Sequence, residues 1–234
     1  MTQNLVALVI TFAIALLWLR LNDFTAHRGW IGSDLSRKLI HMGTGPIFVL
    51  CWLLFQNTPS ARYLASLVPL AITAQFFLVG TGVIGDDAAV KAMSRNGDRR
   101  EILKGPLYYG IVFVVITALF WYDTPVGIIA LMLMCGGDGL ADIIGRRFGK
   151  RKILWNPNKS WVGSLAMFAG GWFFTVIILG IYIAAGIFSQ PLLKLLPAVT
   201  VIALLATLVE TLPLKDIDNI TITLTAIVLG LLLL

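Results

Sequence analysis

Residues 162–188, VGSLAMFAGGWFFTVIILGIYIAAGIF, lie within the longest uncharged stretch of the chain and indicate its fold class. A helix of about 20 apolar residues crosses a bilayer, and a chain that spans lipid as helices keeps its backbone groups paired. Hydrophobic residues make up 58% of the chain and charged residues 13%. Seven further apolar stretches occur at 4–20, 39–56, 63–84, 106–122, 125–144, 192–212 and 219–234. The sequence predicts an all-α integral membrane protein, one domain over residues 1–234 with seven or eight transmembrane helices.

The basic residues are distributed unevenly between the connections that join these stretches. Of the 18 lysines and arginines, 16 lie in the odd-numbered connections, and only Arg62 and Lys194 lie in the even ones. The positive-inside rule places the odd connections on the cytoplasmic side and both termini outside. The first stretch has no basic region before it, so we expect a transmembrane helix there rather than a signal peptide.

Carboxylates gather at the same predicted face, where every acidic residue except Asp123 lies in or beside an odd connection. Cations together with carboxylates suit a metal-bound polyphosphate, because the cations neutralise phosphate and the carboxylates bind a hard divalent ion. Binding of anionic lipid is the alternative interpretation. It explains the lysines but not the aspartates.

The sharpest local pattern is GGDGLAD at residues 136–142, where Gly137 and Gly139 flank Asp138. Charged residues at such depth are costly and usually functional. In a helix Asp142, Gly145 and Gly149 would share one face with Asp138, which predicts a stripe that binds a divalent ion and admits phosphates close to the backbone. Tight helix packing by these glycines is the alternative.

A polar connection follows the stripe and leads into the next apolar stretch. Pro157 between Asn156 and Asn158 indicates an ordered turn. Lys159 or Ser160 would begin the following helix, where free backbone N–H groups favour phosphate. Further cations precede the turn at Arg146, Lys150 and Lys152.

The run DGLADIIGRRFGKRKILWNPNKSWVGS, from Asp138 to Ser164, resembles the nucleotide-binding signature of the phytol kinase and dolichol kinase family of CTP-dependent polyprenol kinases. RKLIHMGTG from Arg37 and EILKGPLYYG from Glu101 resemble the phytol kinase branch. The resemblance implies transfer of the terminal phosphoryl group of CTP to a long isoprenoid alcohol, with Mg²⁺ or another divalent cation. Dolichol kinase relatives often carry a glutamate where this chain has Val162.

On this resemblance we assign roles to residues of the predicted site. The expected catalytic residues are Asp138, Asp142, Lys159, His41 and Glu101. The expected nucleotide-binding residues are Gly137, Gly139, Gly145, Arg146, Gly149, Lys150, Lys152, Asn156, Asn158, Ser160, Arg37 and Lys38. The expected metal ligands are Asp138, Asp142, Glu210 and Asp218.

Several of these roles have plain alternatives. Arg37, Lys38 and His41 share a helical face and could equally be an interfacial anchor. Glu210 and Asp218 could belong to a solvated turn. We expect Cys51 and Cys135, both inside apolar stretches, to be packing residues.

Two other functions compete with a kinase that takes its alcohol from the bilayer. A membrane CTP:phosphatidate cytidylyltransferase also pairs aspartates with a downstream lysine and serine. A transporter is less favoured, since the charges gather at one face rather than at the bilayer midplane. Without an Arg- and Ser-rich presequence, we expect a bacterial plasma membrane or an internal, thylakoid-type membrane.

Overall fold

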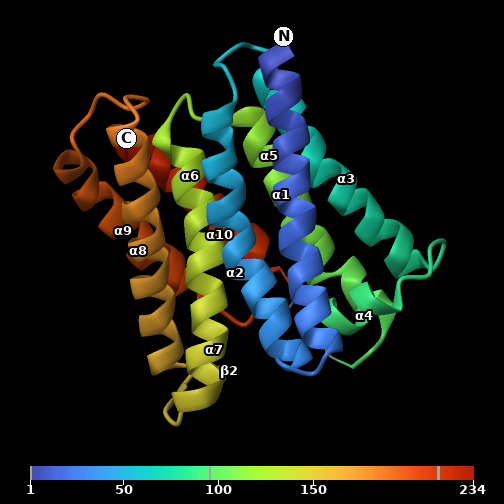
Figure 1. Cartoon of the computed structure of the whole chain (residues 1–234). Coiled ribbons are helices and arrows are strands. Elements are labelled where there is room, and N and C mark those ends of the chain that lie inside the picture. The colour runs from blue at the N-terminus through green and yellow to red at the C-terminus, as the bar shows by residue number, and fades with distance from the viewer. Residues whose placement is uncertain (1, 95, 215–216) are drawn as a thin grey trace. The chain divides into compact units, whose positions relative to one another are not determined.

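The computed structural model describes residues 2–94, 96–214 and 217–234, so Met1, Arg95, Lys215 and Asp216 lie outside the described part. The chain divides into two compact units, Met1–Leu119 and Phe120–Leu234. The helices of both are labelled in Figure 1, where the colour runs from blue at the N-terminus to red at the C-terminus. We describe each unit by itself.

The first unit is built from long apolar helices that are linked by short polar segments. Close contacts at glycine hold these helices together: Gly43 lies against the Trp18 ring and Gly110 against Thr73. Asp86 and Asp98 each accept a hydrogen bond from a backbone N–H and so cap the starts of two short helices. The elements are α1 (Thr2–His27), α2 (Ser33–Cys51), η1 (Trp52–Leu54), α3 (Ala61–Thr81), α4 (Asp87–Met93), η2 (Arg99–Leu103) and α5 (Gly105–Leu119).

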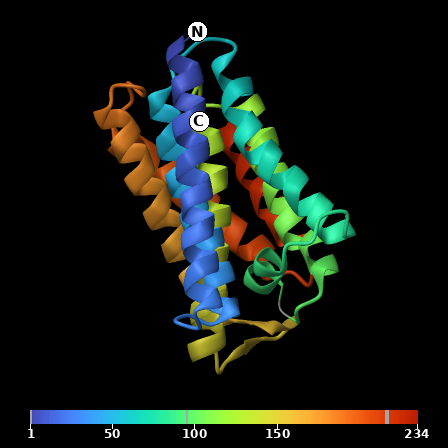
Figure 2. The ribbon, with the colours of Figure 1, turned by 45° about the vertical axis from the view of Figure 1, so that its right-hand side comes forward.

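The second unit has its most deeply buried helix at the start. Here α6 (Pro125–Met132), a π-helical turn η3 (Leu133–Asp138) and α7 (Gly139–Phe148) run on without a break. A hairpin of two strands, β1 (Lys152–Ile153) and β2 (Asn156–Ser160), follows at the end of α7 (Figure 2). Three long helices complete the unit: α8 (Trp161–Ala184), α9 (Leu192–Glu210) and α10 (Asp218–Leu233).

Glycines bring η3 and α7 against α8. A methyl group on Gly170 would meet the Leu140 side chain at 2.5 Å and the Gly136 carbonyl oxygen at 2.8 Å. One on Gly137 would meet the Met167 sulfur at 2.7 Å. Small residues of this kind let two helices approach closely within a membrane. Asp138 therefore lies within a tightly packed helix pair, between the glycine contacts of η3 and those of α7.

The helical part of the prediction is confirmed, because each of the eight apolar stretches forms a helix. Among the described residues, six helices are long and apolar enough to cross a membrane by length and composition, and α10 is shorter. The protein is a polytopic membrane protein. The hairpin is the one departure from an all-α structure within the described ranges, and Cys51 and Cys135 are buried free thiols as expected.

Candidate functional site

The hairpin is fastened to the connection that follows α9. The Asn156 side-chain amide donates hydrogen bonds to the carbonyl oxygens of Thr211 and Leu212, both at 3.2 Å. The Trp155 indole N–H donates to the Thr211 hydroxyl at 3.1 Å. Since Asn156 is buried, these bonds satisfy an amide that would otherwise be costly to bury. The hairpin and the end of α9 are thus held as one structure.

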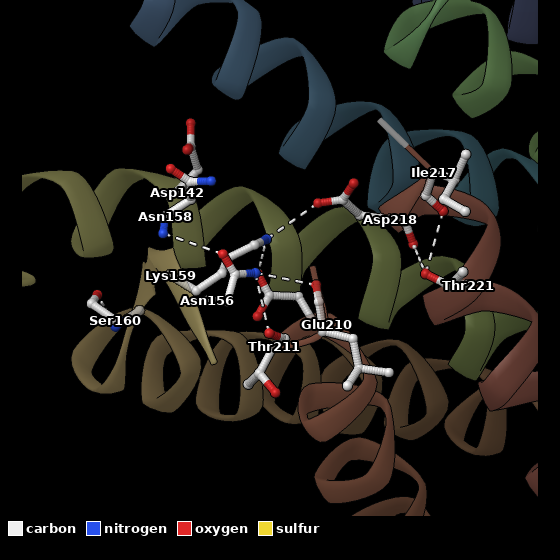
Figure 3. A network of polar contacts seen from close by, with 12 residues as sticks. Asp142, Asn156, Asn158, Lys159, Ser160, Glu210, Thr211, Ile217, Asp218 and Thr221 are labelled. Carbon is white, nitrogen blue, oxygen red and sulfur yellow. Dashed lines mark hydrogen bonds and ion pairs between the residues drawn. The ribbon is translucent and has the colours of Figure 1, made fainter. Parts of the chain in front are cut away.

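Lys159 of β2 lies at the centre of this structure and contacts two carboxylates from other elements (Figure 3). Its ammonium group donates to Oε1 of Glu210, the last residue of α9. It also donates to Oδ2 of Asp218, the first residue of α10, at 3.2 Å. Both partners are more than 50 residues away in the sequence. We call Lys159, Glu210 and Asp218 the lysine cluster.

The charge state of Lys159 follows from its surroundings. Burial by itself would lower the pKa of the Lys159 ammonium group, but the negative charges of Asp138, Glu210 and Asp218 outweigh burial and raise that pKa above its ordinary value. The raised pKa keeps Lys159 cationic throughout the physiological range. Lys159 is therefore suited to stabilising phosphate charge and unsuited to accepting a proton.

Glu210 is the most buried member of the lysine cluster, with 4% of the residue exposed. Its Oε1 faces Lys159, while its Oε2 is buried and has no hydrogen-bond partner among the described residues. A buried carboxylate oxygen without a donor is rare in native structures. This oxygen is a place where a donor group would be stabilised.

Ser160 is the N-cap residue of α8, at the helix start where Lys159 or Ser160 was predicted. Its hydroxyl oxygen accepts a hydrogen bond from the Gly163 N–H at 3.2 Å, which caps the helix. Lys159, by contrast, is not at the helix start, and its side chain belongs to the lysine cluster.

The glycine stripe has a packing role in the structure. A methyl group on Gly149 would meet the Gly145 carbonyl oxygen at 2.1 Å and the Ser160 hydroxyl at 2.2 Å. One on Gly145 would lie 3.3 Å from both Ser160 and Gly163. The tight-packing alternative therefore explains Gly145 and Gly149, and Gly137 likewise packs on Met167. Nucleotide binding by these residues and by Gly139 stays a prediction.

Asp142 lies one helical turn after Asp138 but does not join the lysine cluster. It forms a salt bridge with Arg146 at 2.9 Å, four residues later on the exposed side of α7. Lys150, Lys152 and Asn158 are exposed near the hairpin, where they present charge and polarity to solvent. These placements leave Arg146, Lys150 and Lys152 accessible to an anionic ligand.

The carboxylates predicted to hold a metal are not gathered into a ready-made cage. In the described ranges, no three His, Cys, Asp or Glu residues converge closely enough to hold a metal ion. Mg²⁺ bound with a nucleotide commonly takes one or two carboxylates and completes its shell with phosphate oxygens and water. Asp138 at the end of η3 and Asp142 on α7 fit that requirement, because they supply hard oxygen donors one helical turn apart. Glu210 and Asp218 instead contact an ammonium group, which repels a second cation.

Four predicted site residues belong to the first unit. The His41 carbonyl oxygen accepts a hydrogen bond from the Tyr109 hydroxyl at 2.5 Å, and the two rings lie 4.4 Å apart. Glu101 accepts from the Asn96 amide at 3.0 Å. Arg37 is within 4.0 Å of Asp34 on its own helix, and Lys38 is partly buried beside it. Roles for these four residues in the nucleotide site stay predictions.

Two residues of the site were not identified from the sequence. Thr211 and Trp155 fasten the hairpin, and Asn156, which was assigned to nucleotide, is engaged in the same fastening. The signal available for Asn156 was an amide beside a proline in a short polar connection, which indicates a turn but not its partner. Of the acidic residues after α9, Asp216 lies outside the described residues.

Comparison with known proteins gives relatives over most of the chain. The chain is 41% identical to a probable chloroplastic phytol kinase of Triticum aestivum, over 90% of this chain and 71% of the relative. It is 40% identical to phytol kinase 1 of Arabidopsis thaliana, over 86% of this chain and 66% of the relative. It is also 41% identical to the Arabidopsis thaliana farnesol kinase, over 88% and 67%. No family model and no solved structure match the chain.

The same relatives bear on location. All three are described as chloroplastic, so the expectation of a bacterial membrane is not borne out.

Proposed function

The chain belongs to the phytol kinase family, and from that premise we propose that it phosphorylates the hydroxyl group of an isoprenoid alcohol such as phytol or farnesol. The phosphoryl donor in this proposal is CTP, which leaves as CDP, and Mg²⁺ accompanies the nucleotide. The observation that carries the proposal is the lysine cluster, a partly buried ammonium group that contacts two carboxylates at one end of a membrane-spanning unit, with the negative charge of Asp138 nearby.

The alcohol's properties suit this position. A prenyl tail partitions into lipid, while its hydroxyl group prefers the interface. Glu210 and Asp218 lie where the apolar helices α9 and α10 end and begin, so a hydroxyl arriving from the bilayer would meet polar groups there first. We place this end at the cytoplasmic face, on the charge asymmetry of the connections.

Cationic residues at the hairpin would provide the electrostatic part of catalysis. In phosphoryl transfer, charge spreads over the oxygens of the transferred group, and fixed cations stabilise it. Lys159 is a fixed cation because its partners hold it on both sides. Arg146, Lys150 and Lys152 are exposed at the end of α7 and the start of the hairpin, and in this proposal they contact the nucleotide's phosphates. The protein's contribution is then position and charge.

Asp138 and Asp142 would hold the metal ion in this proposal. A bound Mg²⁺ neutralises phosphate charge and fixes the geometry of the phosphate chain. Asp138 is partly buried at the end of η3, and close packing of α7 on α8 restricts its backbone. A carboxylate that is held in place in this way can raise the rate of the reaction by a large factor.

A labelled nucleotide separates this reaction from that of a CTP:phosphatidate cytidylyltransferase. Purified protein in lipid is supplied with Mg²⁺ and CTP labelled at the γ-phosphate, together with phytol or farnesol. We expect the label to enter the organic phase as alcohol monophosphate, with CDP formed in equal amount. Label found only in pyrophosphate, with phosphatidate consumed, would decide for the cytidylyltransferase.

A further inference from the structure

We propose that Oε2 of Glu210 binds the hydroxyl group of the isoprenoid alcohol and accepts its proton during transfer; this rests on the proposed kinase function. Glu210 is 4% exposed, and Oε2 has no hydrogen-bond partner among the described residues. A hydroxyl donor would satisfy this oxygen, and an alcohol is the substrate component that carries such a donor.

The two oxygens of Glu210 have different tasks. Oε1 is engaged by the Lys159 ammonium group, which fixes the orientation of the carboxylate (Figure 3). Oε2 is left to face another donor. Because the oxygen has no hydrogen bond to lose, a hydroxyl that reaches it gains a full charge-assisted hydrogen bond. Asp218, the other carboxylate on Lys159, is about a third exposed and can be solvated by water.

The step balances as follows. The alcohol oxygen forms a bond to the γ-phosphorus of CTP while the bond from that phosphorus to the β,γ-bridging oxygen breaks. The bonding electrons leave with CDP, and the hydroxyl proton passes to Oε2 of Glu210, which later releases it to solvent. Lys159 keeps its proton and its contact with Oε1 throughout.

The test compares Glu210→Gln with Asp218→Asn, which removes the other partner of Lys159. In Glu210→Gln, Lys159 holds the amide carbonyl, so an NH₂ group takes the place of Oε2 and a donor replaces the acceptor. We expect phytol phosphorylation to fall about 100-fold or more in Glu210→Gln, the usual scale for a positioned base. We expect a smaller loss in Asp218→Asn, and CTP affinity within about 3-fold of wild type in Glu210→Gln.

A second measurement distinguishes proton acceptance from a structural role. A prenol analogue whose hydroxyl is made more acidic by fluorine needs less help from a base. The ratio of wild-type to Glu210→Gln rates should therefore shrink with the fluorinated alcohol. An unchanged ratio, a matching loss of CTP affinity, or a raised Mg²⁺ requirement in Glu210→Gln would each overturn the assignment.

Failure of this inference and failure of the proposed function look different. If the wild-type protein phosphorylates no isoprenoid alcohol, the proposed function is wrong. If the wild-type protein is active and Glu210→Gln is nearly as active, only the role of Glu210 is wrong.

Discussion

The two ends of the second unit are built from the same helices but differ in composition: one end is aromatic and the other is charged. At one end, which we call the aromatic end, Trp121 stacks on Tyr122 with ring centroids 4.7 Å apart, and Tyr182 stacks on Phe188 at 5.7 Å. The connections there, residues 120–124 and 185–191, hold one charged residue, Asp123. The other end, the charged end, holds the hairpin and the lysine cluster.

The difference shows which end needs a functional explanation. Stacked aromatic rings bury large apolar area without electrostatic cost, and they suit the interface of a membrane. Buried charges are expensive even when paired, and an apolar replacement of the same size is often as stable. Packing alone therefore accounts for the aromatic end but not for the charged end.

The largest expected effect comes from Lys159→Met. Loss of the ammonium group leaves Glu210 as an unpaired buried carboxylate, so we expect the free energy of unfolding to fall by about 3–5 kcal/mol and phosphorylation to be lost. Lys194→Met, an exposed lysine near the aromatic end, is the control and should change stability by less than about 0.5 kcal/mol. Denaturant unfolding in detergent measures both. Equal stability of the two variants would show that the lysine cluster does not stabilise the fold.

Asp138→Asn should act on turnover rather than on folding. Asparagine keeps the size of the side chain but removes its charge, so we expect specific activity to fall about 100-fold, with unfolding close to that of wild type. Assays over a range of Mg²⁺ concentration check this result. A variant whose activity falls only in proportion to its yield would make Asp138 a structural residue.

A pair of glycine substitutions compares the two ends directly. Gly149→Ala at the charged end places a methyl group against the Gly145 carbonyl and Ser160, so we expect it to destabilise the protein by about 1–3 kcal/mol. Gly180→Ala in α8 meets only the Leu192 side chain at 3.8 Å, and helix propensity should make it neutral or stabilising by up to about 1 kcal/mol. Thermal unfolding of both variants tests the packing role. If Gly149→Ala instead weakens CTP binding at unchanged stability, the phosphate role predicted for the stripe is favoured.

Ser160→Ala should give the smallest effect. Loss of the hydroxyl leaves the Gly163 N–H without its acceptor, which costs about 1 kcal/mol at a helix start. A large drop in CTP affinity in Ser160→Ala, with stability unchanged, would show that the hydroxyl binds phosphate and does more than cap α8.

Much of the fold could be predicted from the sequence, because the length of a single apolar stretch is enough to identify a membrane helix. Residues 162–188 predicted α8, and Lys159 or Ser160 was expected at its start, where Ser160 is the N-cap residue. The contacts of the site could not be predicted in the same way. Lys159 meets Glu210 across 51 residues, and no local pattern states which carboxylate a lysine will reach.

The glycines show a second limit. At residues 145 and 149 a missing side chain is equally compatible with a close phosphate and with a close helix, and only the positions of Ser160 and Gly163 distinguish the two. The π-helical turn before Asp138 likewise depends on packing, since Gly136 and Gly137 lie against α8.

Hydrogen–deuterium exchange of the wild-type protein, with and without CTP and Mg²⁺, tests the central claim that nucleotide binds at the charged end. The exposed hairpin backbone should exchange quickly alone and slowly when nucleotide covers it. We predict slower exchange at residues 149–160 and at 211–214, and no change at 120–124 and 185–191. Unchanged exchange across the hairpin at saturating CTP would contradict the account.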